Sequence, residues 1–144
     1  MTTMEQENKI GGIIHPLNEN NYVLLKQRKK PIFIKFLPHS NSKNPTKLCP
    51  GNYLLFYLSK QNKSIIGYSK INDILFKTPT EINQQYIDEI QMDKIEFERY
   101  GKNRENKPLM VLILDRIIDF KKKISVDYPI TMTGKYISKD EFIH

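Results

Sequence analysis

The chain has 144 residues, of which 39% are apolar and 27% are charged, and these are ordinary values for one globular domain. Its only cysteine, Cys49, excludes an intramolecular disulfide and a cysteine-based zinc site. No apolar run approaches the roughly 18 residues of a membrane span. We therefore expect a single domain over residues 9–144 behind a flexible tail of residues 1–8, with no membrane partner and in a reducing, cytoplasmic setting.

The net charge is +7, and it is unevenly distributed along the chain. Residues 81–98 hold six carboxylates against one lysine, so the rest of the chain is more basic than the total indicates. A basic surface of this kind favours partners that carry phosphate groups.

The first part of the chain predicts two strands with a short helix between them. Residues 9–16, "KIGGIIHP", are mostly apolar and stop at a proline, as a strand does. Residues 18–30 begin with asparagines that can cap a helix and end in bases that suit the helix dipole. Residues 31–37, "PIFIKFL", alternate between two faces, so Lys35 interrupts an otherwise apolar strand face.

The middle of the chain predicts a hairpin after a polar loop at residues 38–51. Six consecutive apolar or aromatic residues in "NYLLFYLS" (52–59) indicate a strand that is covered on both faces. Residues 60–63 are its turn, and "SIIGYSKINDILF" (64–76) continues as a second strand. Gly67 interrupts this second strand, which indicates a bulge or the close approach of another part of the backbone.

Helix starts are clearest in the second half of the chain. Residues 78–81, "TPTE", combine a capping box with a proline at the first helical position. Asp93 can cap a second short helix, which Gly101 would end. Residues 138–141, "SKDE", are a second capping-box pattern and predict a few helical residues at the C-terminal end.

Two more extended segments complete the predicted fold. Residues 108–120 indicate a central strand with a bend near Asp115, and the lysines at 121–123 indicate a solvated turn. Residues 128–137 are a last extended segment. About five or six strands, often joined by short turns, and two to four short helices predict an α+β domain with a mixed, strongly curved sheet, as in a small β-barrel.

Motifs for catalysis and cofactors are missing. The sequence has no nucleophile elbow, no glycine-rich phosphate loop and no zinc-protease motif. Its three histidines, at positions 15, 39 and 144, are far apart. We therefore expect no metal site, no cofactor and no assignable catalytic residue.

Five residues on the predicted strands are candidates for ligand contact. Lys35 could reach a pocket and meet a phosphate, or it could block pairing at a sheet edge. Tyr57 and Ser59 share a strand face, and Tyr68 follows Gly67 on the next strand. Such a group could stack a base, which is worth about 1–3 kcal/mol per base, or its rings could simply pack in the core.

Basic side chains that stand beside aromatic ones are candidates for holding a nucleic-acid backbone. This interleaving occurs in "KQRKKPIF", "RYGKNRENK" and "GKYISK". The basic candidates are Lys26, Arg28, Lys29, Lys30, Lys35 and Lys135, with Tyr136 as a further stacking ring.

The order of these segments carries a family resemblance. The segments "GIIHP", "PIFIKF", "GNYLLFYLS", "IIGYSKI", "TPTEINQQYIDEI", "PLMVLIL" and "ITMTGKYIS" follow one another over about residues 9–142. In this order the chain resembles an uncharacterised, largely archaeal family of the PUA-like superfamily, whose relatives include the ASCH, EVE and YTH domains.

The resemblance implies a small twisted barrel with a cleft on one side, surrounded by helices. It also implies RNA binding, in some relatives through a modified base in an aromatic pocket. The matches "FYLS" and "IIGYS" place Tyr57, Ser59, Gly67 and Tyr68 at that pocket. Because the chain has no tryptophan, the tryptophan cage of YTH-type readers is absent.

Functions of different classes remain open. The first is a non-enzymatic nucleic-acid-binding domain, for RNA or alternatively for DNA, with a basic surface for the backbone and tyrosines for a base. The second, implied by the ASCH resemblance, is a small amidohydrolase acting on an acylated nucleoside. The residues of the required types are Lys35, Ser59 or Thr133, and Glu96 or Glu98. A third is an interaction module that docks through residues 81–98. The oligomeric state is open.

Overall fold

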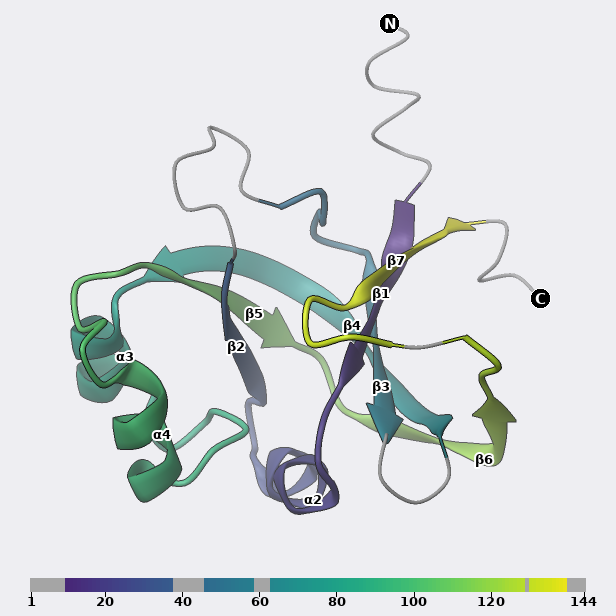
Figure 1. Cartoon of the computed structure of the whole chain (residues 1–144), viewed down its shortest axis with the longest axis horizontal. Helices are drawn as coiled ribbons and strands as arrows, with labels where there is room; N and C mark the ends of the chain where they lie inside the picture. Colours follow the sequence, from purple (N-terminus) through teal and green to yellow (C-terminus); the bar gives the residue numbers. More distant parts are fainter. Residues whose placement is uncertain (1–9, 38–45, 59–62, 129, 140–144) are drawn as a thin grey trace, which may run out of the picture.

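The computed structural model describes residues 10–37, 46–58, 63–128 and 130–139 (Figure 1). The tail predicted at residues 1–8 lies outside these ranges, as does the end of the predicted C-terminal helix. Within them, none of the helices is long and apolar enough to cross a membrane.

Seven strands form the sheet in the described part of the chain. They are β1 (Ile10–Pro16), β2 (Ile32–Phe36), β3 (Tyr53–Leu58), β4 (Ser64–Lys77), β5 (Leu109–Leu114), β6 (Ile118–Ser125) and β7 (Lys135–Ser138). The strand order is β2-β5-β4-β3-β1-β7, and β6 pairs separately with β4. The β1–β3 pair is parallel and the other pairs are antiparallel. The mixed α+β prediction is confirmed.

The predicted barrel is not confirmed, because the sheet does not close. Strand β2 stands at one end of the strand order and the β1–β7 pair at the other, and no ladder joins these ends among the described residues. The long strand β4 arches across the molecule between them (Figure 1). The two ends therefore leave an open seam, which we define as the space between β2 and β1.

Three helices are described, and they begin where the sequence predicts. They are α2 (Glu19–Gln27), α3 (Pro79–Gln85) and α4 (Lys94–Gly101). Their caps are Asn18, Thr78 in a full capping box with Glu81, and Asp93. Helices α3 and α4 lie together at one end of the molecule, beside β2, and α2 lies near the ends of β1 and β2 (Figure 1).

One stretch differs from the prediction. Residues 108–120 do not form a single bent strand, because β5 ends at Leu114 and β6 begins at Ile118. The lysines at 121–123 lie inside β6, which pairs with β4 alone, and do not form a turn. Almost every residue of β6 is exposed or half-buried, so it lacks the apolar alternation that identifies a strand. Lysines are common on such edge strands because they discourage further pairing.

Alternating side chains divide the core into three clusters. Phe33 of β2 and Phe56 of β3 belong to the inner cluster, which the curved sheet surrounds together with α2. Ile34 of β2 belongs to the helix cluster, packed with residues of α3 and α4. Tyr57 of β3 belongs to the outer cluster. As predicted for 52–59, β3 is therefore covered on both faces.

The free edge of β2 is covered by the segment that leads into α4. The backbone N–H of Ile34 donates to Gln91 Oε1 (3.0 Å), and Gln91 Nε2 donates to the Ile34 carbonyl (2.8 Å). The N–H of Phe36 donates to the Tyr100 hydroxyl (2.9 Å). These bonds satisfy buried backbone groups and prevent another strand from pairing with β2.

We expect Gln91→Met to destabilise the fold by about 2–4 kcal/mol, because it leaves the N–H and C=O of Ile34 buried without partners. Urea denaturation measures the loss. The matched control is Gln84→Met, an exposed glutamine of α3, which should change stability by less than about 0.5 kcal/mol. Equal effects of the two changes would contradict this account of the β2 edge.

Candidate ligand-binding cleft

A cleft of about 860 Å³ lies at the seam between β2 and β1. Strand β2 lines it with Phe33 to Leu37, and the end of β1 lines it with His15 and Pro16. The start of α2, helix α4 and the residues at 132–133 complete its walls. The failure of the sheet to close therefore creates a hollow into which side chains of the inner face open.

His15 is the most constrained polar residue of the cleft. It is 5% exposed, and its ring meets the Phe33 ring edge-on, with 4.9 Å between the centroids. Its Nδ1 lies 2.8 Å from the Pro16 carbonyl oxygen, in a hydrogen bond. Its Nε2 is buried and makes no hydrogen bond in the structure. Buried polar atoms are rarely left in this state, so Nε2 marks a place that a ligand could complete.

Lys35 is the second buried polar residue of the cleft. It is 8% exposed and makes no hydrogen bond or ion pair with any described residue. Burial lowers the pKa of Lys35 to about 8. Burial, followed by the charge of Lys35, lowers the pKa of His15 to about 4, although the backbone groups of Pro16 and Met132 act in the opposite direction. At neutral pH Lys35 is therefore charged and His15 is neutral.

Aromatic rings and cations form one rim of the cleft. The Phe36 and Tyr100 rings lie 5.0 Å apart between centroids. The Arg104 guanidinium lies 4.0 Å above the Phe36 ring, and the Lys107 ammonium lies 5.8 Å from it. Burial raises the pKa of the Tyr100 hydroxyl, which therefore stays protonated. Flat groups with positive charge suit a ligand that is both aromatic and anionic.

The opposite wall carries polar groups. Asn21 Nδ2 donates to Glu96 Oε2 (2.9 Å), which joins α2 to α4 across the cleft. Thr133 also lines the cleft and shares a 2.7 Å hydrogen bond with Thr131. The same cleft is thus lined by Lys35, Thr133 and Glu96. These three are among the residues that the sequence offers for an amidohydrolase. Glu98 does not line it, and Ser59 lies outside the described residues.

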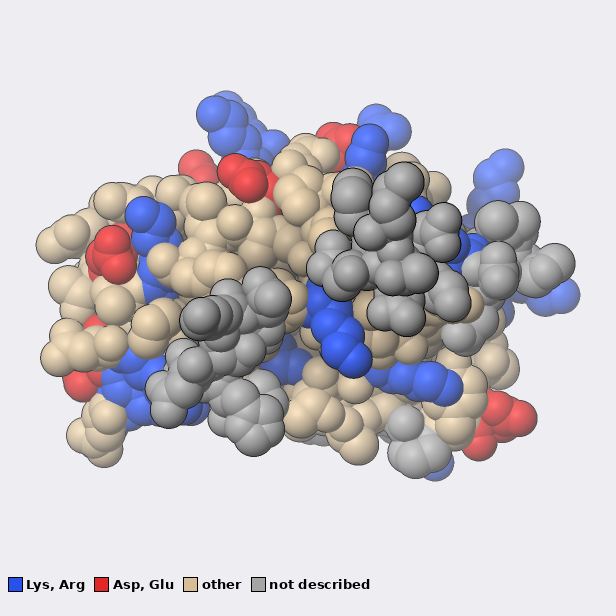
Figure 2. Space-filling model, turned by 90° about the horizontal axis from the view of Figure 1, so that it is seen from above, with Lys and Arg blue, Asp and Glu red and all other residues tan. Residues whose placement is uncertain are grey.

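A second hollow, of about 460 Å³, lies at the C-terminal end of α2, and we call it the basic groove. Lys26, Arg28, Lys29, Lys30 and Arg116 line it. Arg28 is committed to the fold, because Nε donates to the Ile90 carbonyl (3.1 Å). Lys29, Lys30 and Arg116 are exposed. On the face seen from above, Figure 2 shows Lys and Arg side chains at several separate places, with Asp and Glu side chains among them.

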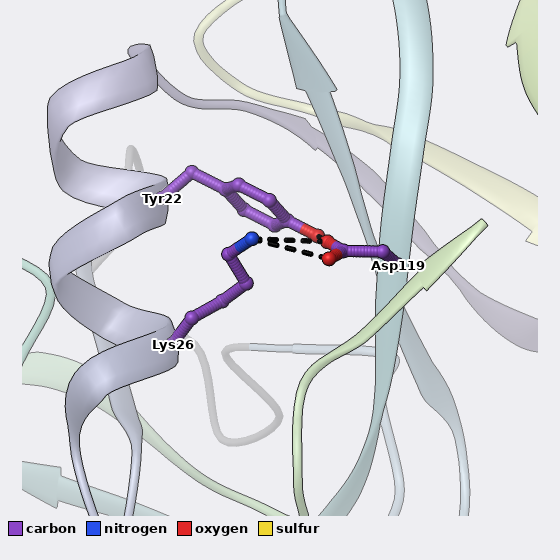
Figure 3. Close-up of polar contacts among 3 residues, drawn as sticks. All are labelled: Tyr22, Lys26 and Asp119. Atoms are coloured by element: carbon purple, nitrogen blue, oxygen red, sulfur yellow. Dashed lines mark hydrogen bonds and ion pairs between the residues drawn. The ribbon is translucent and has the colours of Figure 1, made fainter. Parts of the chain in front are cut away.

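Lys26 takes part in a contact between α2 and β6 (Figure 3). Its Nζ lies 3.1 Å from Asp119 Oδ2, and the Tyr22 hydroxyl donates to Asp119 Oδ1. The bond from Tyr22, followed by Lys26, lowers the pKa of Asp119. A Cβ at Gly67 would overlap the Tyr22 hydroxyl and come within 2.8 Å of the Ile118 carbonyl oxygen. Because Gly67 has no side chain, the Tyr22 side chain and the backbone at Ile118 can both approach β4 closely. A close approach at Gly67 is what the sequence predicts.

The predicted tyrosines lie elsewhere. Tyr57 is 4% exposed in the outer cluster, and Tyr68 packs against the same cluster, where its ring lies 5.1 Å from that of Phe120. Neither lines the cleft of Lys35. Lys135 lies 3.5 Å above the Tyr128 ring, and Tyr136 is exposed. Contact of these residues with a ligand stays a prediction.

Some of the cleft residues have no signal in the sequence that marks them as part of a site. Nothing local to "IIHP" indicates that His15 lies beside Lys35. Tyr100 and Arg104 stand in "RYGKNRENK", which the interleaving of rings and bases identifies, although the pattern does not show that they face β2. No group of three or more potential metal ligands gathers among the side chains that the structure describes.

Comparisons with known proteins identify a family and a fold. Residues 10–139 match the model of a family described as "Domain of unknown function (DUF365)". The uncharacterised protein MJECS03 of Methanocaldococcus jannaschii is 27% identical over 100 residues, which are 62% of this chain and 92% of that protein.

Two solved structures share the fold at low sequence identity. An ASCH protein from Zymomonas mobilis superposes with a TM-score of 0.73 and 12% identity, over 92% of each chain. The N-terminal domain of McrB from Staphylothermus marinus gives a TM-score of 0.50 and 10% identity, over 83% of this chain and 81% of that one. The fold is therefore ASCH-like, as the resemblance implies. The implied relation to EVE and YTH domains stays a prediction.

We expect Lys35→Met to stabilise the protein at neutral pH by about 1–3 kcal/mol, because it removes a partly desolvated charge that has no partner among the described residues. The folded pKa of Lys35 is lowered, so its charge opposes folding fully below about pH 8. The difference from the unchanged protein should shrink as the pH rises from 8 toward 10.5, the ordinary pKa of a lysine, which applies in the unfolded chain.

Urea denaturation at several pH values between 7 and about 10 measures this difference. Lys70→Met, at an exposed position of β4, is the matched control and should change stability little at every pH. A loss of stability in Lys35→Met would show that the lysine supports the fold.

Proposed function

The chain belongs to the DUF365 family, and we propose that it is a non-enzymatic domain that binds single-stranded nucleic acid. A base would enter the cleft at the seam, and the basic groove would hold the sugar–phosphate backbone. RNA is the first expectation and single-stranded DNA is the alternative.

One observation carries the proposal: a cleft large enough for a base is lined by two largely buried polar residues whose side chains lack a hydrogen bond, at His15 Nε2 and at the Lys35 ammonium, among the described residues. His15 is 5% exposed and Lys35 is 8% exposed, and neither His15 Nε2 nor the Lys35 ammonium is hydrogen-bonded within the described part of the chain. Both reduce the stability of the empty protein. Groups in a cleft that have a shifted pKa or lack a hydrogen bond are typical of binding sites. Contacts with the ligand offset the free energy that burying such groups costs.

The second element is the basic groove. Lys29, Lys30 and Arg116 are exposed there, with Asp115 as a carboxylate beside them. The cleft lies at the start of α2 and the groove at its end. A helix of nine residues is roughly 14 Å long at 1.5 Å per residue. This separation suits a polymer, whose backbone can reach from one site to the other.

We expect short single-stranded RNA to bind with an affinity that falls as salt rises from about 50 to about 200 mM. Three phosphate contacts predict a slope of roughly −2 in a plot of log affinity against log salt. The double change Lys29→Ala and Lys30→Ala should make the slope shallower by roughly 1.4. Fluorescence anisotropy measures both, and a DNA strand of the same sequence tests the alternative.

The matched control is the double change Lys121→Ala and Lys122→Ala on β6, which removes the same charge from exposed positions outside the groove. It should leave the slope nearly unchanged. An equal decrease in both double variants would show that net charge, without a defined groove, accounts for binding. Absence of binding at low salt would refute the proposal.

A second candidate function is hydrolysis of an acylated nucleoside. The observation that favours it is the presence of Lys35, Thr133 and Glu96 around one cleft. A lysine with a pKa near 8 can exchange protons near neutral pH, a hydroxyl can attack an acyl carbon, and a carboxylate can accept a proton. These are the residue types that the sequence analysis proposes for this reaction.

This candidate predicts release of free acid and amine from an N-acylated cytidine, followed by chromatography. Lys35→Met and Thr133→Val should each abolish the release, whereas Thr131→Val, at an exposed site two residues away, should not. If no substrate is consumed by the unchanged protein, or if both threonine variants react alike, this candidate is excluded.

A further inference from the structure

From the proposed function, we infer that His15 and Lys35 together read one particular base edge, in which a carbonyl oxygen stands next to a ring N–H. Uracil has this edge on both sides of its ring N–H, and guanine has it once. The inference names the class of base that the cleft prefers.

The protonation state of His15 determines which ligand group can bind to its Nε2 atom. The Pro16 carbonyl oxygen can only accept a hydrogen bond, so the 2.8 Å contact requires the proton on Nδ1 of His15. The neutral ring then has a lone pair on Nε2, and this atom is buried and without a hydrogen bond. A ligand that completes Nε2 must therefore bring a donor, such as an N–H.

Lys35 sets the complementary requirement. Its ammonium has three donors and no acceptor, and no described residue accepts from it. A ligand must bring an acceptor to it, and a carbonyl oxygen is a strong one. His15 packs against Phe33, which lies two residues from Lys35 on the same face of β2, and both His15 and Lys35 line the cleft. We infer that neighbouring atoms of one ligand can meet both groups.

A phosphate group fits this pair poorly. It offers acceptors only, so His15 would need a second proton on Nε2 to bind it. That imidazolium would be buried against the Phe33 ring. Burial and the charge of Lys35 oppose it and outweigh the backbone groups of Pro16 and Met132, which favour it, so the pKa of His15 is lowered to about 4. A neutral base edge with a donor next to an acceptor can form hydrogen bonds with both His15 and Lys35, and neither residue has to change its protonation state.

The shape of the cleft agrees with a flat heterocycle. The ring of His15 stands at its inner end against Phe33, and the rings of Phe36 and Tyr100 stand at its rim. The Arg104 guanidinium that covers Phe36 is itself flat, so the rim already accommodates a stacked planar group.

The test uses oligomers of the sugar–phosphate backbone that carry a single base. One oligomer carries uracil, a second carries N3-methyluracil, which lacks the N–H, and a third carries no base. We expect the unchanged protein to bind the uracil oligomer about tenfold more tightly than the N3-methyl one, because methylation leaves Nε2 unsatisfied. Fluorescence anisotropy measures the three affinities, with inorganic phosphate as a competitor.

Variants test whether His15 and Lys35 account for the binding of uracil. His15→Leu should bring the ratio of the two affinities close to one, because the N–H then has no acceptor. Lys35→Met, which we expect to fold, should weaken the binding of both oligomers several-fold, because both keep the carbonyl oxygen that Lys35 would contact. Lys121→Met, at an exposed site on β6, should change neither the affinities nor the ratio. Should His15→Leu not fold, the N3-methyl comparison in the unchanged protein and the loss of affinity in Lys35→Met decide.

Three results would overturn the inference. Equal affinity for uracil and N3-methyluracil would show that the N–H is not read, and an unchanged affinity for the uracil oligomer in Lys35→Met would exclude that residue. Displacement of the uracil oligomer by inorganic phosphate, lost in Lys35→Met, would identify an anion site instead. In these cases salt-dependent binding of the base-free backbone would keep the proposed function. If no oligomer binds, the proposed function fails as well.

Discussion

The structure depends on strand β4, which spans Ser64–Lys77 and takes part in three of the six strand pairings. Its first half pairs with β3 and β6, and its second half pairs with β5. One strand thus holds both halves of the sheet, and the sheet must bend along it. The bend brings β2 near β1, close enough for Phe33 and His15 to touch, while no ladder forms between them. The seam left there is the cleft.

The seam explains why polar groups are buried beside an apolar core. The inner face of β2 carries Phe33 within the sheet and then Lys35 at the opening, so the lysine leaves water without gaining a partner among the described residues. His15 stands at the corresponding end of β1. Both positions lower the stability of the empty protein, and sites that sacrifice stability in this way are commonly functional.

The likeness to the ASCH protein is a likeness of fold at 12% identity. A shared fold does not transfer a function, because function depends on the side chains placed in the site. In this chain the cleft holds a neutral histidine and a lysine, neither of which has a hydrogen bond at Nε2 or at the ammonium within the described residues, together with two aromatic rings. Binding of a base requires these groups to form hydrogen bonds, whereas hydrolysis of an acylated nucleoside requires nucleophilic attack and proton transfer. Experiments can therefore distinguish the two candidate functions.

Local patterns were enough to predict the helix caps at Thr78 and Asp93, a cap among the asparagines that include Asn18, the strand alternation around Lys35 and the close approach at Gly67. Each depends on neighbours within a few residues, which is the range of capping and periodicity. The open seam, the separation of β6 from β5 and the meeting of His15, Lys35 and Tyr100 in one cleft arose only in the tertiary structure. The pairing of β6 with β4 and the meeting of these three cleft residues join residues 20 or more positions apart. Local periodicity does not show which distant faces a bent sheet brings together.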